Sequence, residues 1–172
     1  MSLTHGSCTL LTISDSRTQV TDDSGDAIEQ KLLEQGHKIL GRAIVQDDLS
    51  DIQSSIKEVL AKQCESHFII TTGGSGIGVR DCTPEAIRQF EHIPLDGFGE
   101  LFRMYSERDI GARAMLSRAT AGILTQNNKQ NDKRVPFFIL PGSTHAVTLA
   151  MDVCILPIIG HVLDLCHSKE QA

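Results

Sequence analysis

A glycine-rich segment, Thr71-Thr72-Gly73-Gly74-Ser75-Gly76, carries the strongest indication of chemistry in this 172-residue chain. Consecutive glycines let the backbone turn with positive φ and let a ligand approach without meeting a Cβ atom. The N–H groups of such a turn, with the hydroxyl groups of the segment, would form a cradle for an anion. No Gly-Lys-Ser/Thr follows, and the glycine spacing is not that of a dinucleotide fingerprint. The alternative is a strand-to-helix turn that binds nothing.

Arg80 and Asp81 follow this segment and suggest a metal ion. A carboxylate beside an anion cradle would repel a bare phosphate, whereas Mg²⁺ binds one or two carboxylates together with phosphate oxygens. Asp47 or Asp48, at the end of another expected strand, would supply the second carboxylate. The alternative for that pair is a solvated turn at a helix start. Arg80 would pair either with phosphates or with Asp81.

Two further segments could contact a ligand. Pro141-Gly142-Ser143-Thr144-His145 repeats the pattern of strand, glycine turn and helix start, and a helix N-terminus favours phosphate or carboxylate groups. Ordinary capping by Ser143 is the alternative, and His145 would either face the ligand or be exposed. Gly97-Phe98-Gly99-Glu100 is the second segment, although its composition favours a helix start that packs Phe98 and Phe102.

The elements that would position these residues alternate between strand and helix. Short apolar runs predict five strands, at Cys8–Ser14, Ile39–Val45, His67–Thr72, Ala119–Leu124 and Pro136–Leu140. Helical spacing of apolar residues predicts four helices, whose caps would be Ser24, Ser50 or Asp51, Thr83 and Ser143. Another helical region spans Gly97–Leu116 with a break at Gly111, and Pro157 interrupts the last helix.

This alternation predicts one α/β domain over residues 1–172, a three-layer sandwich with a mostly parallel sheet between helices. Ligands of such folds bind at the carboxyl ends of the strands. Asp15, the Asp47-Asp48 pair, the segment from Gly73 to Asp81 and the Pro141 turn should all meet at that edge. Thr125 to Arg134 lacks apolar residues and predicts a mobile surface loop. Residues 1–6 and 167–172 are expected to be flexible ends.

Composition excludes several classes of protein. The net charge of −6 argues against a nucleic-acid partner. No apolar run is long enough for a membrane helix, and the first residues do not resemble a secretory signal, so we expect no membrane partner and a cytoplasmic protein. The five cysteines include no Cys-x-x-Cys, which gives no indication of a zinc knuckle or a redox pair.

Taken together, the motifs resemble one family. The run TTGGSG…RDCTPEA, then GFGELFR, Ser117-Arg118-Ala119 and LPGSTHAV, is similar to the MoaB/MogA family of molybdenum-cofactor biosynthesis. The likeness extends from about Cys8 to Leu163 and is closer to the MoaB branch. It implies an α/β sandwich, a homotrimer or homohexamer, and adenylylation of molybdopterin by ATP with Mg²⁺, which releases pyrophosphate. The alternative within the family is a non-catalytic molybdopterin-binding or scaffold protein.

The resemblance also implies roles for individual residues. Asp81 and Asp47 would hold Mg²⁺ or orient the phosphates, with Asp47 favoured over Asp48. The segment Gly73-Gly74-Ser75-Gly76 would cradle the nucleotide phosphates, while Asp15 and the Pro141-Gly142-Ser143 turn would frame the nucleotide and pterin pockets. Ser75 stands where members commonly carry threonine, which keeps the hydroxyl. His145 stands where lysine is often found, and a neutral imidazole attracts phosphate less than an ammonium group.

Overall fold

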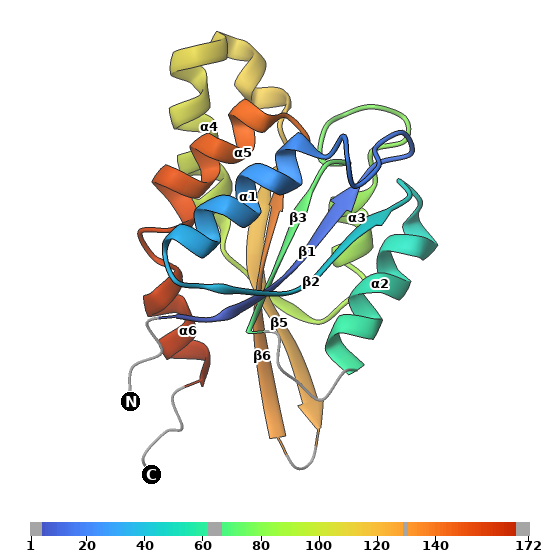
Figure 1. The fold of residues 1–172 in the computed structure, drawn as a ribbon, viewed down its shortest axis with the longest axis vertical. Helices are drawn as coiled ribbons and strands as arrows, with labels where there is room; N and C mark the ends of the chain where they lie inside the picture. The colour runs from blue at the N-terminus through green and yellow to red at the C-terminus, as the bar shows by residue number, and fades with distance from the viewer. Residues whose placement is uncertain (1–4, 62–66, 129–130, 168–172) are drawn as a thin grey trace.

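The computed structural model of the protein describes residues 5–61, 67–128 and 131–167. Figure 1 shows a central sheet with helices on both sides. The elements follow one another in the order β1 (Ser7–Ile13), α1 (Asp23–Glu34), β2 (Lys38–Val45), α2 (Leu49–Ala61), β3 (Phe68–Thr72), α3 (Thr83–Ile87), β4 (His92–Pro94), α4 (Asp96–Ile110), a 3₁₀ helix (Gly111–Leu116), β5 (Thr120–Asn128), β6 (Asn131–Leu140), α5 (Thr144–Ala150), a π-helical turn (Met151–Ile155) and α6 (Ile159–His167).

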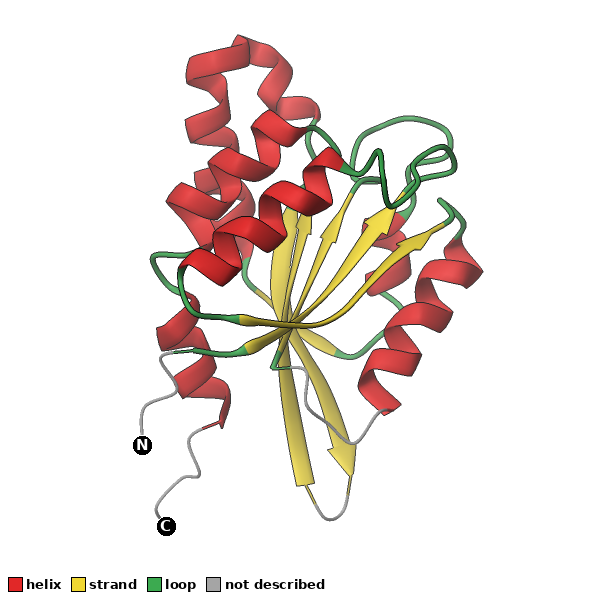
Figure 2. Cartoon of the chain, in the orientation of Figure 1, coloured by secondary structure: helices red, strands yellow, loops and turns green. Residues whose placement is uncertain are grey.

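The six strands form one twisted sheet in the order β2-β1-β3-β6-β5-β4 (Figure 2). The pairs β1–β2, β1–β3 and β3–β6 are parallel, and β5 runs antiparallel to both of its neighbours. The five predicted strands and the mostly parallel α/β sandwich are therefore confirmed. The short strand β4 was not predicted, because three residues that include Pro94 give too little pattern to recognise.

Helices cover both faces of the sheet, so the central strands are buried on both sides. Leu10 and Leu11 of β1 point to opposite faces and are 0% and 2% exposed. On the first face Leu10 packs among residues of α1, α4, α5 and α6, whereas Leu11 packs on the other face among residues of α2 and α3. Each such side chain stabilises the fold by about 1.5–3 kcal/mol when fully buried. This two-sided burial explains why the strands appear as continuous apolar runs.

The first residues of α1 and α2 differ from those predicted. Asp22, not Ser24, caps α1, and its Oδ1 accepts a hydrogen bond of 3.0 Å from Gly25 N–H. Asp48 precedes α2, and its Oδ1 accepts from Ser50 N–H at 2.8 Å, so neither Ser50 nor Asp51 is the cap. In both places several adjacent residues could cap, and only the backbone path decides which one does.

The prediction of a mobile surface loop from Thr125 to Arg134 is wrong. The described part of this segment belongs to an antiparallel hairpin in which Thr125 pairs with Arg134 and Gln126 with Lys133. A hairpin that extends beyond the helices has solvent on both faces and satisfies its backbone through the partner strand. Polar composition therefore gave no indication of the strand. Residues 129–130 lie outside the described residues.

The end of the chain bends where a break was predicted. The segments Thr144–Ile155 and Ile159–His167 meet at 60° on either side of Pro157. Within the described residues, no single helix has the length and apolarity needed to span a bilayer, and this bent pair meets that test only when both parts are taken together. The predicted flexible ends fall mostly outside the described residues. Gly6 is described and donates its N–H to His37 Nδ1 at 3.0 Å.

Candidate functional site

The predicted ligand segments meet at the carboxyl ends of the parallel strands, where the loops after β1 and β3 lie together (Figure 1). Asp15, after β1, accepts a hydrogen bond of 3.1 Å from the N–H of Asp47, after β2. Thr72, at the end of β3, donates its hydroxyl to the carbonyl of Pro141, after β6, at 2.8 Å. Four chain segments distant in sequence are therefore joined at one edge of the sheet.

The glycine turn after β3 requires glycine for two physical reasons. Gly73 and Gly74 have φ angles of +99° and +62°, which residues with a side chain rarely adopt. A Cβ on Gly73 would lie 2.2 Å from the carbonyl oxygen of Ile13, and one on Gly74 would lie 2.9 Å from Asp47 Oδ1. A Cβ on Gly142 would lie 3.3 Å from the Cα of Gly73. The two predicted glycine turns therefore pack against each other.

Thr83 braces this turn. Its N–H donates to the carbonyl of Gly74 and its hydroxyl to the carbonyl of Gly73, each at 3.0 Å. The prediction that Thr83 caps α3 is wrong, because Thr83 is the first residue of the helix and Cys82 precedes it without a side-chain cap. The hydroxyl that would have capped the helix instead fixes the glycine turn against α3.

Asp81 folds back over the second half of the loop. Its Oδ2 accepts the N–H of Gly78 at 2.6 Å. A Cβ on either Gly76 or Gly78 would lie 2.8 Å from that oxygen. These two glycines therefore make room for the Asp81 carboxylate, a role that the sequence did not reveal.

Asp47 faces the glycine turn, whereas Asp48 does not. Burial raises the pKa of Asp47, and the charges of Asp81 and Asp15 add to this against hydrogen bonds from Cys82 that lower it. Hydrogen bonds from Ser50 and then Asp51 lower the pKa of Asp48, which is occupied in capping α2. The geometry thus favours Asp47 as the second carboxylate of the site.

Cys82 donates its thiol to Asp47 Oδ1 at 3.5 Å. Burial, followed by the hydrogen bond and charge of Asp47, raises the pKa of this thiol to about 11. A thiol with such a pKa is protonated at neutral pH and is a poor nucleophile.

Arg80 does not pair with Asp81. Its Nη2 lies 2.9 Å from Asp15 Oδ2 and donates to the carbonyl of Asp47 at 3.3 Å. The Arg80 side chain is 67% exposed, so the ion pair contributes about 1 kcal/mol or less. Arg80 is therefore held at the mouth of the site by contacts that an anionic ligand can replace at low cost.

The Pro141-Gly142-Ser143 turn leads into α5, which Ser143 caps by accepting the N–H of Ala146 at 3.2 Å. His145 is exposed, and its Nε2 lies 2.9 Å from Oδ2 of Asp109 at the end of α4. Between α4 and α5 lies a cavity of about 160 Å³. Its lining is mainly apolar and includes Phe102, Ile110, Ala114, Pro141, Ala146 and Leu149.

The remaining candidate residues lie on α4 and within the glycine-rich segment itself. Glu100 is exposed on α4, and no hydrogen bond or ion pair among the described residues joins it to the glycine turn. Phe98 and Phe102 are 7% and 1% exposed, so that segment forms the helix start expected as the alternative. Ser75 is buried, and the buried hydroxyl of Thr71 meets no hydrogen-bond partner within the described parts of the chain.

Arg118 contacts the glycine-rich loop and was not assigned a role from its surroundings in the sequence. It donates from Nε to the carbonyl of Gly76 at 2.7 Å and from Nη2 to the carbonyl of Asp81 at 2.9 Å. Its Nη1 pairs with Oε1 of Glu85 in α3. These partners lie 33 to 42 residues away, so no local pattern could have indicated the contact.

The carboxylates fit a divalent cation that is shared with a ligand. Among residues 5–61, 67–128 and 131–167, no three His, Cys, Asp or Glu side chains form a complete protein cage for a metal. Mg²⁺ does not require one, because it binds through one or two carboxylates plus phosphate and water. Asp47 and Asp81 could hold it, and it would offset the charges of Asp81 and Asp15, which add to burial in raising the pKa of Asp47.

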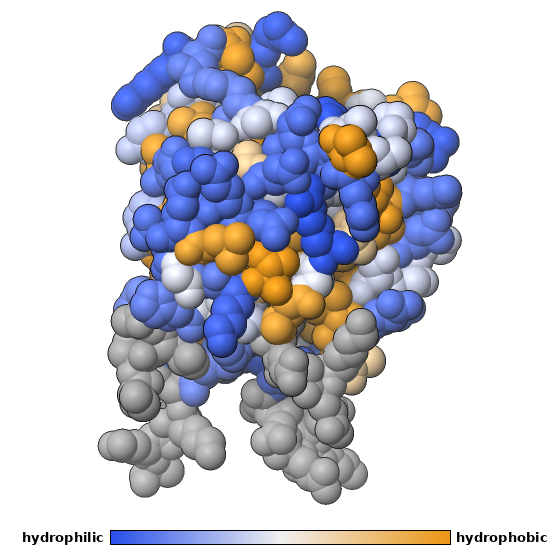
Figure 3. All heavy atoms as spheres, viewed as in Figure 1, coloured by the Kyte–Doolittle hydropathy of each residue, from blue (hydrophilic) through white to orange (hydrophobic). Residues whose placement is uncertain are grey.

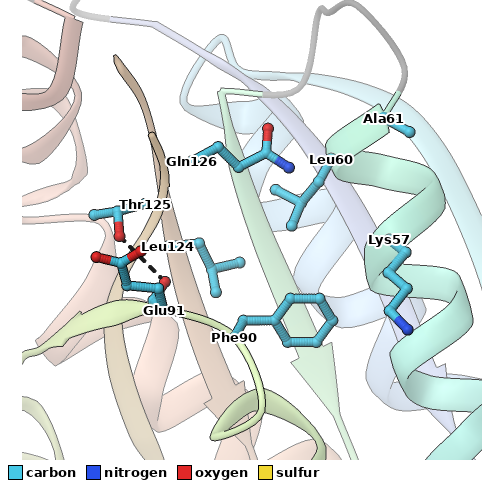
Figure 4. Close-up of a pocket in the computed structure, with 8 residues that line it drawn as sticks. All are labelled: Lys57, Leu60, Ala61, Phe90, Glu91, Leu124, Thr125 and Gln126. Atoms are coloured by element: carbon cyan, nitrogen blue, oxygen red, sulfur yellow. Dashed lines mark hydrogen bonds between the residues drawn. The ribbon is translucent and has the colours of Figure 1, made fainter. Parts of the chain in front are cut away.

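A second cavity, of about 140 Å³, lies near the end of α2 that is remote from Asp47. Figure 4 shows Leu60, Phe90 and Leu124 turned toward one another across it. The hydroxyl of Thr125 donates to the carbonyl of Glu91 at 3.3 Å, which joins β5 to the turn before β4. This cavity is a packing gap between α2 and the sheet and lies apart from the predicted site residues.

Comparisons with known proteins identify the family of the chain. The family described as "Probable molybdopterin binding domain" matches residues 7–161. The chain is 44% identical over 157 residues to Molybdenum cofactor biosynthesis protein B of Halalkalibacterium halodurans, covering 91% of this chain and 87% of that protein. It is 43% identical over 163 residues to the protein of the same name from Bacillus cereus, covering 94% and 91% of the two chains.

Solved structures give the same result. A crystal structure of Molybdenum cofactor biosynthesis protein B superposes with a TM-score of 0.87 at 39% identity and covers 98% of this chain and 100% of that chain. The tungsten cofactor synthesizing protein MoaB from Pyrococcus furiosus superposes with a TM-score of 0.80 at 30% identity and covers 94% and 96%. From the extent of the family match and these relatives, the chain belongs to the molybdopterin-binding-domain family, within the MoaB/MogA group of molybdenum-cofactor biosynthesis proteins.

Proposed function

We propose that the protein adenylylates molybdopterin with ATP in a Mg²⁺-dependent reaction that releases pyrophosphate. The observation that carries this proposal is the meeting of two glycine turns, at Gly73-Gly74 and Gly142, with the carboxylates of Asp47 and Asp81 at one edge of the sheet. One turn suits the phosphates of a nucleotide, and the other suits the phosphate of a second substrate. Family membership supports a pterin as that second substrate.

In this reaction a terminal phosphate oxygen of molybdopterin attacks the α-phosphorus of ATP. A new oxygen–phosphorus bond forms, the bond from the α-phosphorus to the bridging oxygen breaks, and pyrophosphate leaves with the electron pair. Negative charge therefore grows on the leaving group, and catalysis depends on positioning and on electrostatic stabilisation. The loop N–H groups bind the nucleotide phosphates, and Asp47 and Asp81 orient them. Mg²⁺, when bound to these carboxylates, supplies positive charge for the leaving pyrophosphate.

The second substrate would lie on the Pro141–Ser143 side of the site. The cavity between α4 and α5 opens beside this turn and offers apolar walls to a ring. His145 would attract a phosphate when it is protonated, in place of the lysine found in many relatives. Asp15 and Arg80 frame the nucleotide side, since they lie in the loops after β1 and β3 and pair with each other at 2.9 Å.

One observation favours a second function, a MoaB-like protein that binds molybdopterin without adenylylating it. His145 is paired with Asp109 at 2.9 Å, so the position that would attract phosphate is engaged by a carboxylate. The two functions share the pocket and differ in chemistry. Incubation of the pure protein with ATP, Mg²⁺ and molybdopterin separates them, because only the adenylyltransferase releases pyrophosphate.

We also propose that the protein is a homotrimer or homohexamer. Met104, Ile110, Met115 and Leu116 are 47% to 74% exposed on α4 and the 3₁₀ helix that follows it. Figure 3, which is viewed as in Figure 1, shows further hydrophobic side chains gathered across the middle of this face, in the region of the edge strand β2. Exposed apolar surface of this kind is typical of a contact between subunits. Light scattering coupled to size exclusion measures the mass and distinguishes monomer, trimer and hexamer.

A further inference from the structure

Arg118 spans the back of the glycine-rich loop and joins it to α3. Its Nε and Nη2 donate to the carbonyls of Gly76 and Asp81 at 2.7 and 2.9 Å, and its backbone N–H donates to the carbonyl of Ser75 at 3.0 Å. Its remaining nitrogen pairs with the Glu85 carboxylate. Arg118 therefore binds three carbonyl groups of the loop: those of Ser75 and Gly76, and that of Asp81 near its end.

These contacts decide which way the loop N–H groups point. In a trans peptide the carbonyl of one residue and the N–H of the next point in opposite directions. Because the carbonyls of Ser75, Gly76 and Asp81 turn toward Arg118, the N–H groups of Gly76, Ile77 and Cys82 turn away from it. Of these, the N–H of Cys82 lies on the side of Asp47, to whose carboxylate the thiol of the same residue donates at 3.5 Å.

The other two N–H groups are available to a ligand. Within the described parts of the chain, neither Gly76 N–H nor Ile77 N–H donates a hydrogen bond. Ile77 is 68% exposed, so this part of the loop is open to solvent. An anion that approaches on the side opposite Arg118 would meet two adjacent donors.

We propose that Arg118 is the positioning residue of the anion cradle, because it fixes the peptide orientation that presents the N–H groups of Gly76 and Ile77 to a phosphate chain. This inference rests on the proposed function, which supplies the phosphate ligand. Arg118 acts from behind the loop and does not touch the ligand. A planar guanidinium holds several acceptors in fixed directions, whereas a lysine ammonium cannot bridge them all.

The test compares Arg118→Met and Arg118→Lys with the control Arg88→Met. Arg88 lies 3.9 Å from the same Glu85 oxygen, but among the described residues it donates to no atom of the loop. Calorimetry measures the affinity of each protein for ATP with Mg²⁺ and for inorganic pyrophosphate, and circular dichroism and thermal unfolding monitor the fold. We expect Arg118→Met to bind both ligands about tenfold more weakly or worse, Arg118→Lys to be intermediate, and Arg88→Met to equal the wild type.

Each outcome has a distinct meaning. If the wild type binds both ligands and Arg118→Met binds them equally well, the inference fails and the proposed function stands. If the wild type binds neither ligand, the proposed function fails and the inference fails with it. If Arg118→Met does not fold, Arg118→Lys becomes the test. Wild-type affinity of Arg118→Lys for both ligands would also overturn the positioning role of Arg118. A rise in KM for ATP together with a fall in kcat, in Arg118→Lys but not in Arg88→Met, would support it.

Discussion

Replacement of Gly74 by alanine tests two requirements of the glycine turn: a positive φ, and the absence of a Cβ where other atoms lie close. Gly74 has a φ of +62°, and an added Cβ would lie 2.3 Å from Thr83 Oγ1 and 2.9 Å from Asp47 Oδ1. Gly111 is a matched control because it has a φ of +59° with no atom within 4 Å of an added Cβ. Gly97, in the first turn of α4, has neither constraint.

The expected changes in the free energy of unfolding follow from these contacts. A residue with a Cβ held at such a positive φ costs about 1–3 kcal/mol, and this is the whole effect expected for Gly111→Ala, whose ψ of −146° places it in a region that almost only glycine occupies. Gly74→Ala adds loss of the hydrogen bond from Thr83 to the carbonyl of Gly73 and displacement of Asp47, about 1 kcal/mol each. Gly97→Ala should be stabilising by up to about 1 kcal/mol. At about 2–4 °C per kcal/mol, Gly74→Ala should lose roughly 6–20 °C in Tm and Gly111→Ala roughly 2–12 °C, with the contacts of Gly74 accounting for about 4–8 °C of the difference.

Thermal unfolding and calorimetry with ATP and Mg²⁺ check both parts of this prediction. Gly74→Ala should weaken ATP binding about tenfold or more, because the Cβ displaces groups on both sides of the cradle. Gly111→Ala should bind ATP like the wild type despite its lower Tm. The reasoning is refuted if Gly74→Ala matches Gly111→Ala in both Tm and affinity.

Three further predictions concern other parts of the molecule. His145→Lys should bind molybdopterin more tightly, because the compact ammonium group of lysine attracts phosphate more strongly than an imidazole; equal affinity, measured by calorimetry, would exclude a phosphate at this position. Asp22→Ala should lower the free energy of unfolding by about 3 kcal/mol in urea titrations, because it removes the cap of α1, the acceptor of the Thr12 hydroxyl at 2.6 Å and the buried partner of Arg42 at 2.8 Å. Burial, and then His5 and His167 respectively, lower the pKa of His37 and His67, so the folded state resists protonation and stability is lost as pH falls below about 6.5. The variant His37→Gln/His67→Gln should therefore lose less Tm than the wild type on acidification, and an identical loss would contradict this assignment.

Much of the fold could be predicted because its signals are local. β1 and β3 are short apolar runs bounded by turn residues, and burial on both faces is the physical cause of that pattern. The meeting of Asp15, Asp47 and the glycine turn also follows from local signals, because the carboxyl ends of parallel strands share one edge. The residues alone left Asp47 and Asp48 equivalent, and the family resemblance favoured Asp47. The physical reason required the structure, since only the path of the chain shows which side chain caps α2.

The contacts that could not be predicted connect distant residues. Arg118 reaches the loop across about 40 residues, and Arg80 pairs with Asp15 although Asp81 is its neighbour in sequence. The reason for Gly76 and Gly78 was hidden as well, because the group that fills their missing side-chain space is the carboxylate of Asp81. Spacing identified a glycine loop but could not show which atoms enter it.

Release of pyrophosphate from ATP, in the presence of molybdopterin and Mg²⁺, tests the central claim most directly. The comparison is between wild type, Asp81→Asn and the control Asp48→Asn, in which asparagine keeps the cap of α2. Asparagine at position 81 retains an oxygen for the N–H of Gly78, so the loop should keep its shape. We predict release by the wild type and by Asp48→Asn, and at least about a hundredfold slower release by Asp81→Asn. No release by the wild type, or equal release by Asp81→Asn, would contradict the proposed adenylyltransferase and the role of its acid.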